Sequence, residues 1–292
     1  MPRETGLPES RVRDICDALT AGGVAEQVGS EIRLTADWGA LTSSTAFAPL
    51  VDSLRMNDVN IRSLRDLAGQ GGGFEDLSTA DRLTYARAVS RNPISPALVA
   101  AVRQAAWTPA SIRARARDED RHLELGCGVA GRILCALQAF PSMTAVGVEL
   151  DPDLAAEARR RSERLGVAGR FVVVCADATS VRLDGVFDIV AWSQFFFTEA
   201  SRPGTLATAY AALKPGGLIL APLLGDDHAA AAEPHGTEAR SLARSRVVHG
   251  GWSVPGRSAT ELVDEMTAAG FADAAVTPAA ESPLRIVYAT RP

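Results

Sequence analysis

The sequence lacks paired cysteines, long apolar runs and an excess of basic residues, which are typical of disulfide-rich, membrane-spanning and nucleic-acid-binding proteins. It has only four cysteines, none in CxxC spacing, so we expect neither a disulfide framework nor a metal site. Its longest apolar runs, such as 218–224, are too short to span a bilayer, and the first residues lack a signal peptide's apolar stretch. Basic residues are not in excess, since 30 Lys and Arg face 35 Asp and Glu. These absences favour a cytoplasmic protein with a small-molecule partner, and no nucleic acid or membrane partner.

Residues 1–93 predict a mainly helical, winged-helix-like domain. Apolar residues recur at helical spacing from Val12 to Leu19, and Gly29 with Ser30 centres a predicted hairpin over 28–34. Helical patterns return over 50–67 and, after a glycine-rich loop at 71–73, between Ser78 and Pro93. A winged helix raises the hypothesis of DNA binding. The segment holds 10 Lys and Arg against 13 Asp and Glu, however, and this net charge of −3 opposes phosphate binding.

Residues 94–120 predict a linking helix, because Ser95 caps a helix with Pro96 at its first position. Beyond it, short apolar runs alternate with amphipathic stretches, the pattern of an α/β fold with a parallel sheet. We predict a doubly wound, mostly parallel, seven-stranded sheet of the Rossmann-like type over 121–292. The last two strands are too close in sequence for a parallel crossover and should form an antiparallel hairpin. The predicted strands are 122–126, 144–149, 171–176, 187–193, 218–224, 274–278 and 284–289.

A glycine loop follows the first predicted strand and opens a helix. The loop reads Glu-Leu-Gly-Cys-Gly-Val-Ala-Gly over 124–131, and its glycines allow a sharp turn and close approach to a ligand. The same spacing fits a nicotinamide-binding loop. Three acids narrow the choice, since Glu124, Glu149 and Asp177 each lie at the carboxyl end of a different predicted strand. In a doubly wound sheet these ends line one crevice.

With these residues in this order, the segment from Arg121 to Pro292 resembles the class I S-adenosylmethionine (SAM)-dependent methyltransferases. The resemblance implies that Glu149 accepts hydrogen bonds from the ribose of SAM, that Leu150 packs on the adenine, and that Asp177 with Ala178 meets the adenine amino edge. It also implies that the glycine loop wraps the amino-acid half of SAM. The implied cofactor-binding residues are Glu124, Gly126, Cys127, Gly128, Gly131, Glu149, Leu150, Asp177, Ala178 and Ser193.

The substrate side is expected after the fourth strand and in an insertion at about 225–256. The segment 192–197 lacks the Asn/Asp-Pro-Pro-Tyr motif of methyltransferases that act on nucleobases, which favours a small substrate. Histidine can take a proton near neutral pH, so three histidines of the insertion are candidate bases. The candidates are His228 first, then His235 and His249. The predicted substrate-binding residues are Trp192, Gln194, Phe195, Phe197 and Trp252.

The sequence therefore predicts SAM-dependent methylation of a small metabolite of secondary metabolism. The N-terminal domain is expected to cover the active site or to form a homodimer. Two alternatives stay open: the fold catalyses a non-methylating step such as a cyclisation or elimination, or the protein is a SAM-responsive regulatory module. A nicotinamide enzyme is disfavoured by Glu124, two positions before the first glycine of the loop, and by the short chain after the fifth strand.

Overall fold

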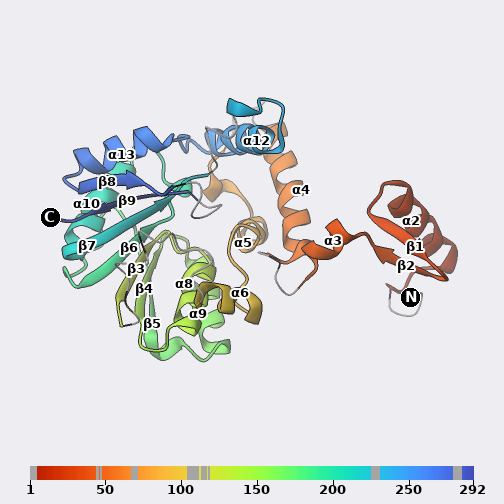
Figure 1. Ribbon diagram of the computed structural model, residues 1–292, viewed down its shortest axis with the longest axis horizontal. Coiled ribbons are helices and arrows are strands. Elements are labelled where there is room, and N and C mark those ends of the chain that lie inside the picture. Colours follow the sequence, from red (N-terminus) through yellow and green to blue (C-terminus); the bar gives the residue numbers. More distant parts are fainter. Residues whose placement is uncertain are drawn as a thin grey trace.

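A computed structural model describes residues 5–43, 46, 48–66, 72–103, 112, 117, 119–224, 231–278 and 285–292. The chain divides into a large sheet region and a smaller helical part that extends away from it (Figure 1). The far end of that helical part is a helix-hairpin unit, residues 5–43. It contains α2 (Glu9–Ala21), the antiparallel pair β1 (Ala25–Val28) and β2 (Glu31–Leu34), and α3 (Ala36–Leu41). The predicted helix and hairpin are both present.

The middle helices connect this unit to the sheet. They are α4 (Leu50–Asp66), the short turn η1 (Phe74–Asp76), α5 (Thr79–Ala88) and α6 (Pro96–Arg103). The Ser78 hydroxyl accepts a hydrogen bond from the Asp81 N–H at 3.2 Å and caps α5. The Ser95 hydroxyl accepts one from the Leu98 N–H at 3.1 Å at the start of α6. Most of the predicted linking segment beyond Arg103 lies outside the described residues.

The sheet has seven strands in the order β5-β4-β3-β6-β7-β9-β8. β3 to β7 pair in parallel, while β9 pairs antiparallel with both β7 and β8, which confirms the predicted C-terminal hairpin. The strands are β3 (Arg121–Leu125), β4 (Thr144–Glu149), β5 (Phe171–Cys175), β6 (Phe187–Trp192), β7 (Leu213–Pro222), β8 (Ala272–Val276) and β9 (Ile286–Thr290).

One strand boundary differs clearly from the prediction. β7 begins at Leu213 rather than 218, because the turn residues Gly216 and Gly217 stay within the ladder. The Gly216 N–H donates to the Arg291 carbonyl at 2.8 Å, and the Arg291 N–H donates to the Gly217 carbonyl at 2.9 Å. The register shifts between Phe187 and Ile189 of the neighbouring strand, so the turn forms an irregular start of β7.

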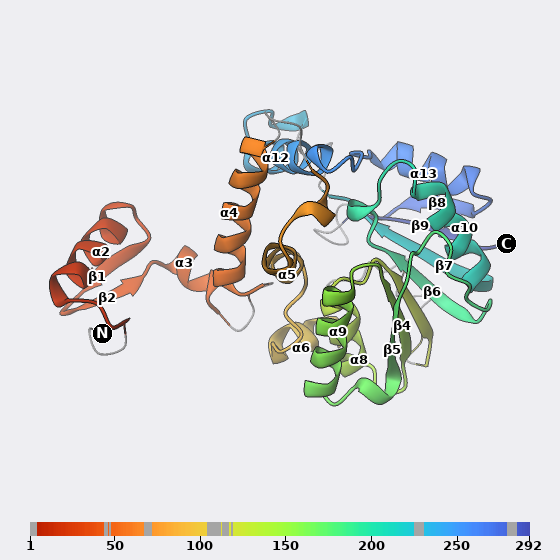
Figure 2. The same cartoon turned by 180° about the vertical axis from the view of Figure 1, so that it is seen from behind.

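Helices cover both faces of the sheet (Figures 1 and 2). Alternate residues of β4 enter two separate core clusters: Ala145 packs with α8 and α9, whereas Val146 and Val148 pack with α10 and α13. These helices are α8 (Gly131–Ala139), α9 (Pro152–Arg164), α10 (Arg202–Ala212) and α13 (Ala259–Ala268). Another helix, α12 (Thr237–Gly251), lies beside α4. Among the described residues, no helix combines the length and apolarity that crossing a membrane requires.

Candidate functional site

The glycine loop joins β3 to α8 through left-handed backbone conformations. Gly126 and Gly128 have positive φ angles of 71° and 55°, in the left-handed region that glycine adopts freely. A Cβ at Gly126 would lie 2.8 Å from Cε2 of Phe197, whereas a Cβ at Gly128 would meet no atom of the described residues within 4 Å. The loop is therefore packed against the protein at Gly126 and open at Gly128, the side from which a ligand can approach the backbone.

Glu149, at the end of β4, holds the glycine loop in place. Its side chain is buried, and its Oε2 accepts a hydrogen bond from the Gly128 N–H at 2.7 Å while Oε1 accepts one from the Asp151 N–H at 3.0 Å. Burial raises the pKa of this carboxyl, and the two backbone hydrogen bonds oppose that rise. Each carboxylate oxygen has a second lone pair, so Glu149 retains acceptor capacity for ligand hydroxyls.

Glu124 supplies an unsatisfied acceptor beside the loop. Its Oε1 accepts a hydrogen bond from Nε of Arg132 at 2.9 Å. Its buried Oε2 and the buried Nη2 of Arg132 have no hydrogen-bond partner among the described residues. An orphaned buried carboxylate oxygen is costly unless a donor reaches it. An ammonium group of a ligand would satisfy it, as the amino-acid part of SAM would.

The remaining predicted cofactor residues lie around the same strand ends. Leu150 exposes 69% of its surface, which leaves its side chain free to pack on a flat ring. Asp177 is exposed, and its Oδ1 accepts a hydrogen bond from the Thr179 N–H at 2.8 Å, while Ala178 is buried. Burial, followed by the charge of Glu149, raises the pKa of the Cys127 thiol. Together with the open glycine loop, these residues fit SAM in composition and position.

Two predicted residues have structural contacts that the sequence did not indicate. The Gly131 N–H donates to the Ser90 hydroxyl at 2.9 Å, and a Cβ at Gly131 would overlap the backbone carbonyl of Arg91. Gly131 thus allows the segment after α5 to pack directly on the start of α8. Ser193 is half-buried, and its N–H donates to the Leu125 carbonyl at 3.0 Å, which places it beside the glycine loop.

The predicted substrate residues after β6 lie in two different environments, the protein interior and the surroundings of the glycine loop. Trp192 is fully buried in the core, and the Arg202 guanidinium lies 4.6 Å from the centre of its ring. Gln194 is buried as well and faces Arg202. Phe195 is half-buried, and Phe197 packs on Gly126. In this structure Phe197 meets the glycine loop directly, while Trp192 and Gln194 support the turn from inside.

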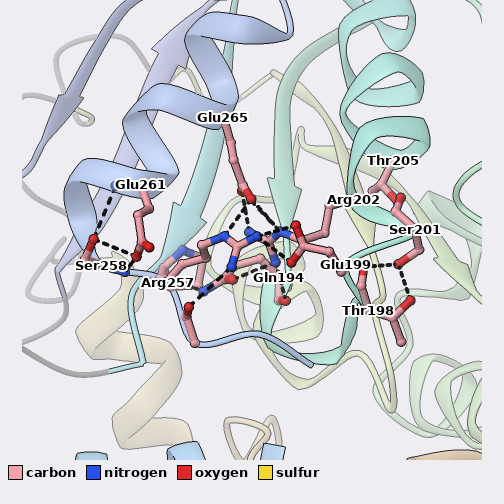
Figure 3. A network of polar contacts seen from close by, with 12 residues as sticks. Gln194, Thr198, Glu199, Ser201, Arg202, Thr205, Arg257, Ser258, Glu261 and Glu265 are labelled. Atoms are coloured by element: carbon pink, nitrogen blue, oxygen red, sulfur yellow. Dashed lines mark hydrogen bonds and ion pairs between the residues drawn. The ribbon is translucent and has the colours of Figure 1, made fainter. Parts of the chain in front are cut away.

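An ion network around the buried Arg202 fixes this turn, which is the short helix η3 (Gln194–Phe196) (Figure 3). Nη1 of Arg202 donates to the Gln194 carbonyl at 3.3 Å and to its Oε1 at 3.2 Å. Nη2 of the same arginine lies 2.6 Å from Oε2 of Glu265. Glu265 also pairs with Arg257 at 2.7 Å, and Arg257 reaches Glu199 at 2.6 Å. The network joins η3 to α13 and to the segment that follows α12.

An aromatic cluster lies on the other side of η3. Phe196 approaches Phe74 with ring centres 5.5 Å apart and Tyr85 at 6.1 Å, and Trp252 lies 4.9 Å from Tyr85. Burial raises the pKa of Tyr85 to about 12, so its phenol stays protonated at neutral pH. The cluster consists of Phe74, Tyr85, Phe196, His249 and Trp252. Sequence reasoning found His249 and Trp252. It missed Phe74 and Tyr85, because no motif marks these N-terminal residues.

His249 is the candidate base that the structure brings to this cluster. Its ring centre lies 6.0 Å from that of Phe196 and 5.5 Å from that of Trp252. Nδ1 lies 2.7 Å from the Ser245 carbonyl oxygen, which can only accept, so Nδ1 carries the proton and Nε2 keeps its lone pair. Burial lowers the pKa of His249 against the raising effect of that hydrogen bond, so the ring is neutral at pH 7. His235 is exposed, and His228 lies outside the described residues.

The fold and this cofactor crevice define a class I SAM-dependent methyltransferase domain. Residues 123–221, about a third of the chain, match the family model described as a methyltransferase domain. The Escherichia coli protein YjhP is 29% identical over 106 residues, which are 36% of this chain and only 42% of YjhP.

Solved structures show the same fold over nearly the whole chain. Human N-acetylserotonin methyltransferase in complex with SAM is 15% identical, with a TM-score of 0.71 over 99% of this chain and 85% of that one. An O-methyltransferase from neocarzinostatin biosynthesis, in complex with SAM and 2-hydroxy-5-methyl naphthoic acid, is 19% identical. Its TM-score is 0.62 over 99% of this chain and 87% of that one. The similarity therefore includes the N-terminal helices as well as the sheet.

Proposed function

We propose that this protein transfers a methyl group from SAM to a small metabolite that carries an aromatic ring. One observation carries the proposal: two adjacent residues connect the cofactor loop to the aromatic cluster. Phe197 packs on Gly126 of the loop, and Phe196 belongs to the cluster. A flat substrate among these rings would lie next to the amino-acid end of the cofactor crevice. Edge-to-face aromatic contacts are the packing that such a substrate would continue.

The chain's own residues would position the two reactants. SAM supplies an electrophilic methyl group, so catalysis depends mainly on holding the acceptor in line with it. Glu124 and Glu149 would bind the cofactor through their free acceptor capacity, and the glycine loop would approach it closely. His249 would accept the acceptor's proton at Nε2, because the neutral ring already donates from Nδ1 to Ser245. We therefore favour a hydroxyl acceptor, whose proton a neutral imidazole can take.

The N-terminal part would close the substrate side. Phe74 and Tyr85, which precede the sheet region in the chain, supply two of the five cluster residues. α5 also contacts the start of α9, the helix that follows Glu149. Nε of Arg82 donates to Oδ2 of Asp151, and Nη2 of Arg82 lies 3.7 Å from Oδ2 of Asp153. The N-terminal residues would thus form one wall of the substrate site. A role in secondary metabolism is supported by the neighbour from neocarzinostatin biosynthesis.

Binding of S-adenosylhomocysteine, the demethylated product of SAM, tests the cofactor assignment. Glu149→Gln should weaken this binding by about 1.5 to 3 kcal/mol in calorimetry, because charged acceptors of the ribose hydroxyls are lost. Glu163→Gln, an equivalent change at an exposed position of α9, is the control and should leave the affinity unchanged. No detectable binding of SAM or its product to the wild-type protein would contradict the proposal.

Turnover separates methylation from the alternatives. With a panel of hydroxylated aromatic compounds, we expect methylated product and S-adenosylhomocysteine in equal amounts. His249→Gln should lower kcat while cofactor affinity stays unchanged, because Nε2 acts on the acceptor alone. Conversion of a substrate without consumption of SAM would instead support a non-methylating enzyme.

A further inference from the structure

A hollow of about 120 Å³ lies outside the candidate site, between the segment that follows α5 and the C-terminal half of α9. Figure 2 shows α5, α6 and α9 close together in this part of the molecule. Four of its lining residues are arginines, and no Asp or Glu is among the described residues that line it. We name this hollow the arginine pocket, after Arg87, Arg91, Arg161 and Arg164.

The positive charge around the pocket exceeds what its nearest carboxylate can neutralise. Glu157 is buried on α9 and forms ion pairs with four arginines. Its oxygens lie 3.1 Å from Arg87, 3.0 Å from Arg160, 3.3 Å from Arg161 and 3.9 Å from Arg164. Among the described residues, this one negative charge therefore faces four positive charges, and an anion would relieve the excess.

The ionisation of the pocket residues reflects this imbalance. Burial would raise the pKa of Glu157, but hydrogen bonds from Arg160 and Arg87 outweigh it and the pKa is lowered. The pKa of Arg161 is lowered by burial and by the charges of Arg87 and Arg164, against the effect of Glu157. Arg161 remains charged, since a guanidinium stays protonated in proteins. The repulsion among these side chains is an energetic cost that an anionic ligand would remove.

The pocket is held in a defined shape. Nη1 of Arg161 donates to the Val129 carbonyl at 3.3 Å, which fixes this side chain between α9 and the glycine loop. On the opposite wall, the segment after α5 is anchored by the hydrogen bond between Ser90 and Gly131. Both walls thus rest on the start of α8. The arginines do not depend on a ligand to be brought together.

We propose that the arginine pocket binds a phosphoryl group. Guanidinium groups recognise phosphate oxygens through paired, charge-assisted hydrogen bonds, and a phosphoryl group offers several oxygens to several arginines. The volume is far above the 10–15 Å³ or so that a single water needs, so the group would enter with part of the molecule that carries it. Among the other lining residues, Pro49, Pro93 and Leu165 would meet an apolar portion of that molecule.

This site is separate from the methyl-transfer site, so its occupant need not be the methyl acceptor. Its walls come from α5, from the segment that follows α5 and from α9, and α5 also supplies Tyr85 to the aromatic cluster. A bound phosphoryl group would link these walls through new hydrogen bonds. Binding should therefore raise the melting temperature of the full chain without competing with S-adenosylhomocysteine.

The experiment measures binding of inorganic phosphate and of phenyl phosphate to the full chain, with chloride at the same ionic strength as reference. Arg164→Gln should weaken binding at least about tenfold, the loss of one charge-assisted hydrogen bond. Arg164 is suited to substitution because 69% of its side chain is exposed and its contact with Glu157 is long, at 3.9 Å. Tighter binding of phenyl phosphate would identify a phosphorylated small molecule as the ligand, and equal binding would identify free phosphate.

Arg160→Gln is the matched control. Arg160 lies on the same helix, has 57% of its side chain exposed and also contacts Glu157, but it does not line the pocket. Its substitution should change the affinity less than about threefold, which is the effect expected of a surface charge. Equal losses in the two variants would overturn the proposal, because attraction would then depend on net charge alone. Absence of phosphate binding to the wild-type protein, or competition with S-adenosylhomocysteine, would overturn it as well.

Discussion

The sheet region and the helix-hairpin unit bury their apolar side chains to very different degrees. In the sheet region, residues such as Leu123, Val148 and Ile219 are fully buried between two layers of helices. In the helix-hairpin unit, α2 has no buried residue along its 13 positions, and Ile15 and Leu19 are exposed. A segment this short cannot bury enough apolar surface to be stable alone. The sheet region therefore contains its own core, whereas the helix-hairpin unit needs another surface.

The largest expected effect on the free energy of unfolding comes from a substitution in the sheet region, where a charged side chain is buried as well as apolar ones. Glu265→Gln removes the carboxylate that faces the buried Arg202 guanidinium (Figure 3). We expect a loss of about 3 kcal/mol in the free energy of unfolding, because one partner of a buried pair is left uncompensated. Urea denaturation measures it, with exposed Glu163→Gln as control. A loss below about 1 kcal/mol would mean that the network contributes little to the core.

The two regions should also respond differently to acid. The four histidines all follow residue 121, and burial followed by the charge of Arg132 lowers the pKa of His122 to about 3. An unfolded histidine titrates near 6.5, so between that pH and about 3 the unfolded state binds a proton that the folded state does not. Stability of the sheet region should therefore fall as the pH drops below about 6.5, by about 1.4 kcal/mol per pH unit from this residue.

Comparing two histidine variants isolates that contribution. His122→Leu should flatten the pH dependence of unfolding between pH 6 and 4 by nearly one proton. His235→Leu changes an exposed residue and should leave the slope as it is. Equal slopes in the wild-type protein and both variants would show that His122 does not stay neutral in the folded state.

The sheet and its cofactor residues were predictable because their signals are local. Glu124 and Gly126 follow one another at the end of the first predicted strand, and Glu149 ends the second. Because parallel strands bring their carboxyl ends together, the sequence predicts that these residues lie close to one another. The helix cap at Ser95 was equally predictable, because capping depends on residues only a few positions apart. Such features need no knowledge of distant contacts.

The aromatic cluster and the ion network were not predictable in this way. Phe74 meets Phe196, and Arg202 meets Glu265, across long stretches of chain whose packing no periodicity encodes. Trp192 shows the same limit: the sequence suggests a substrate wall, yet the structure places the indole in the core against Arg202. A residue at the end of a strand can face either the crevice or the interior, and only tertiary packing decides between them.

A substitution on α2 should have the smallest effect on the stability of the monomer. It also tests whether the helix-hairpin unit needs another surface, as the comparison with the sheet region implies. We propose that the exposed apolar face of the helix-hairpin unit packs against a second copy of the chain. Leu19→Asp should convert a dimer to a monomer in size-exclusion chromatography with light scattering, because a charge would be buried at the interface. Unfolding of the monomer should change by no more than about 0.5 kcal/mol, as for other exposed positions. Ala21→Asp introduces the same charge change at an exposed position two residues from Leu19, which lies on the other side of α2, and should leave the dimer intact. A wild-type protein that is monomeric at micromolar concentration would refute the pairing and leave this face without an explanation in terms of self-association.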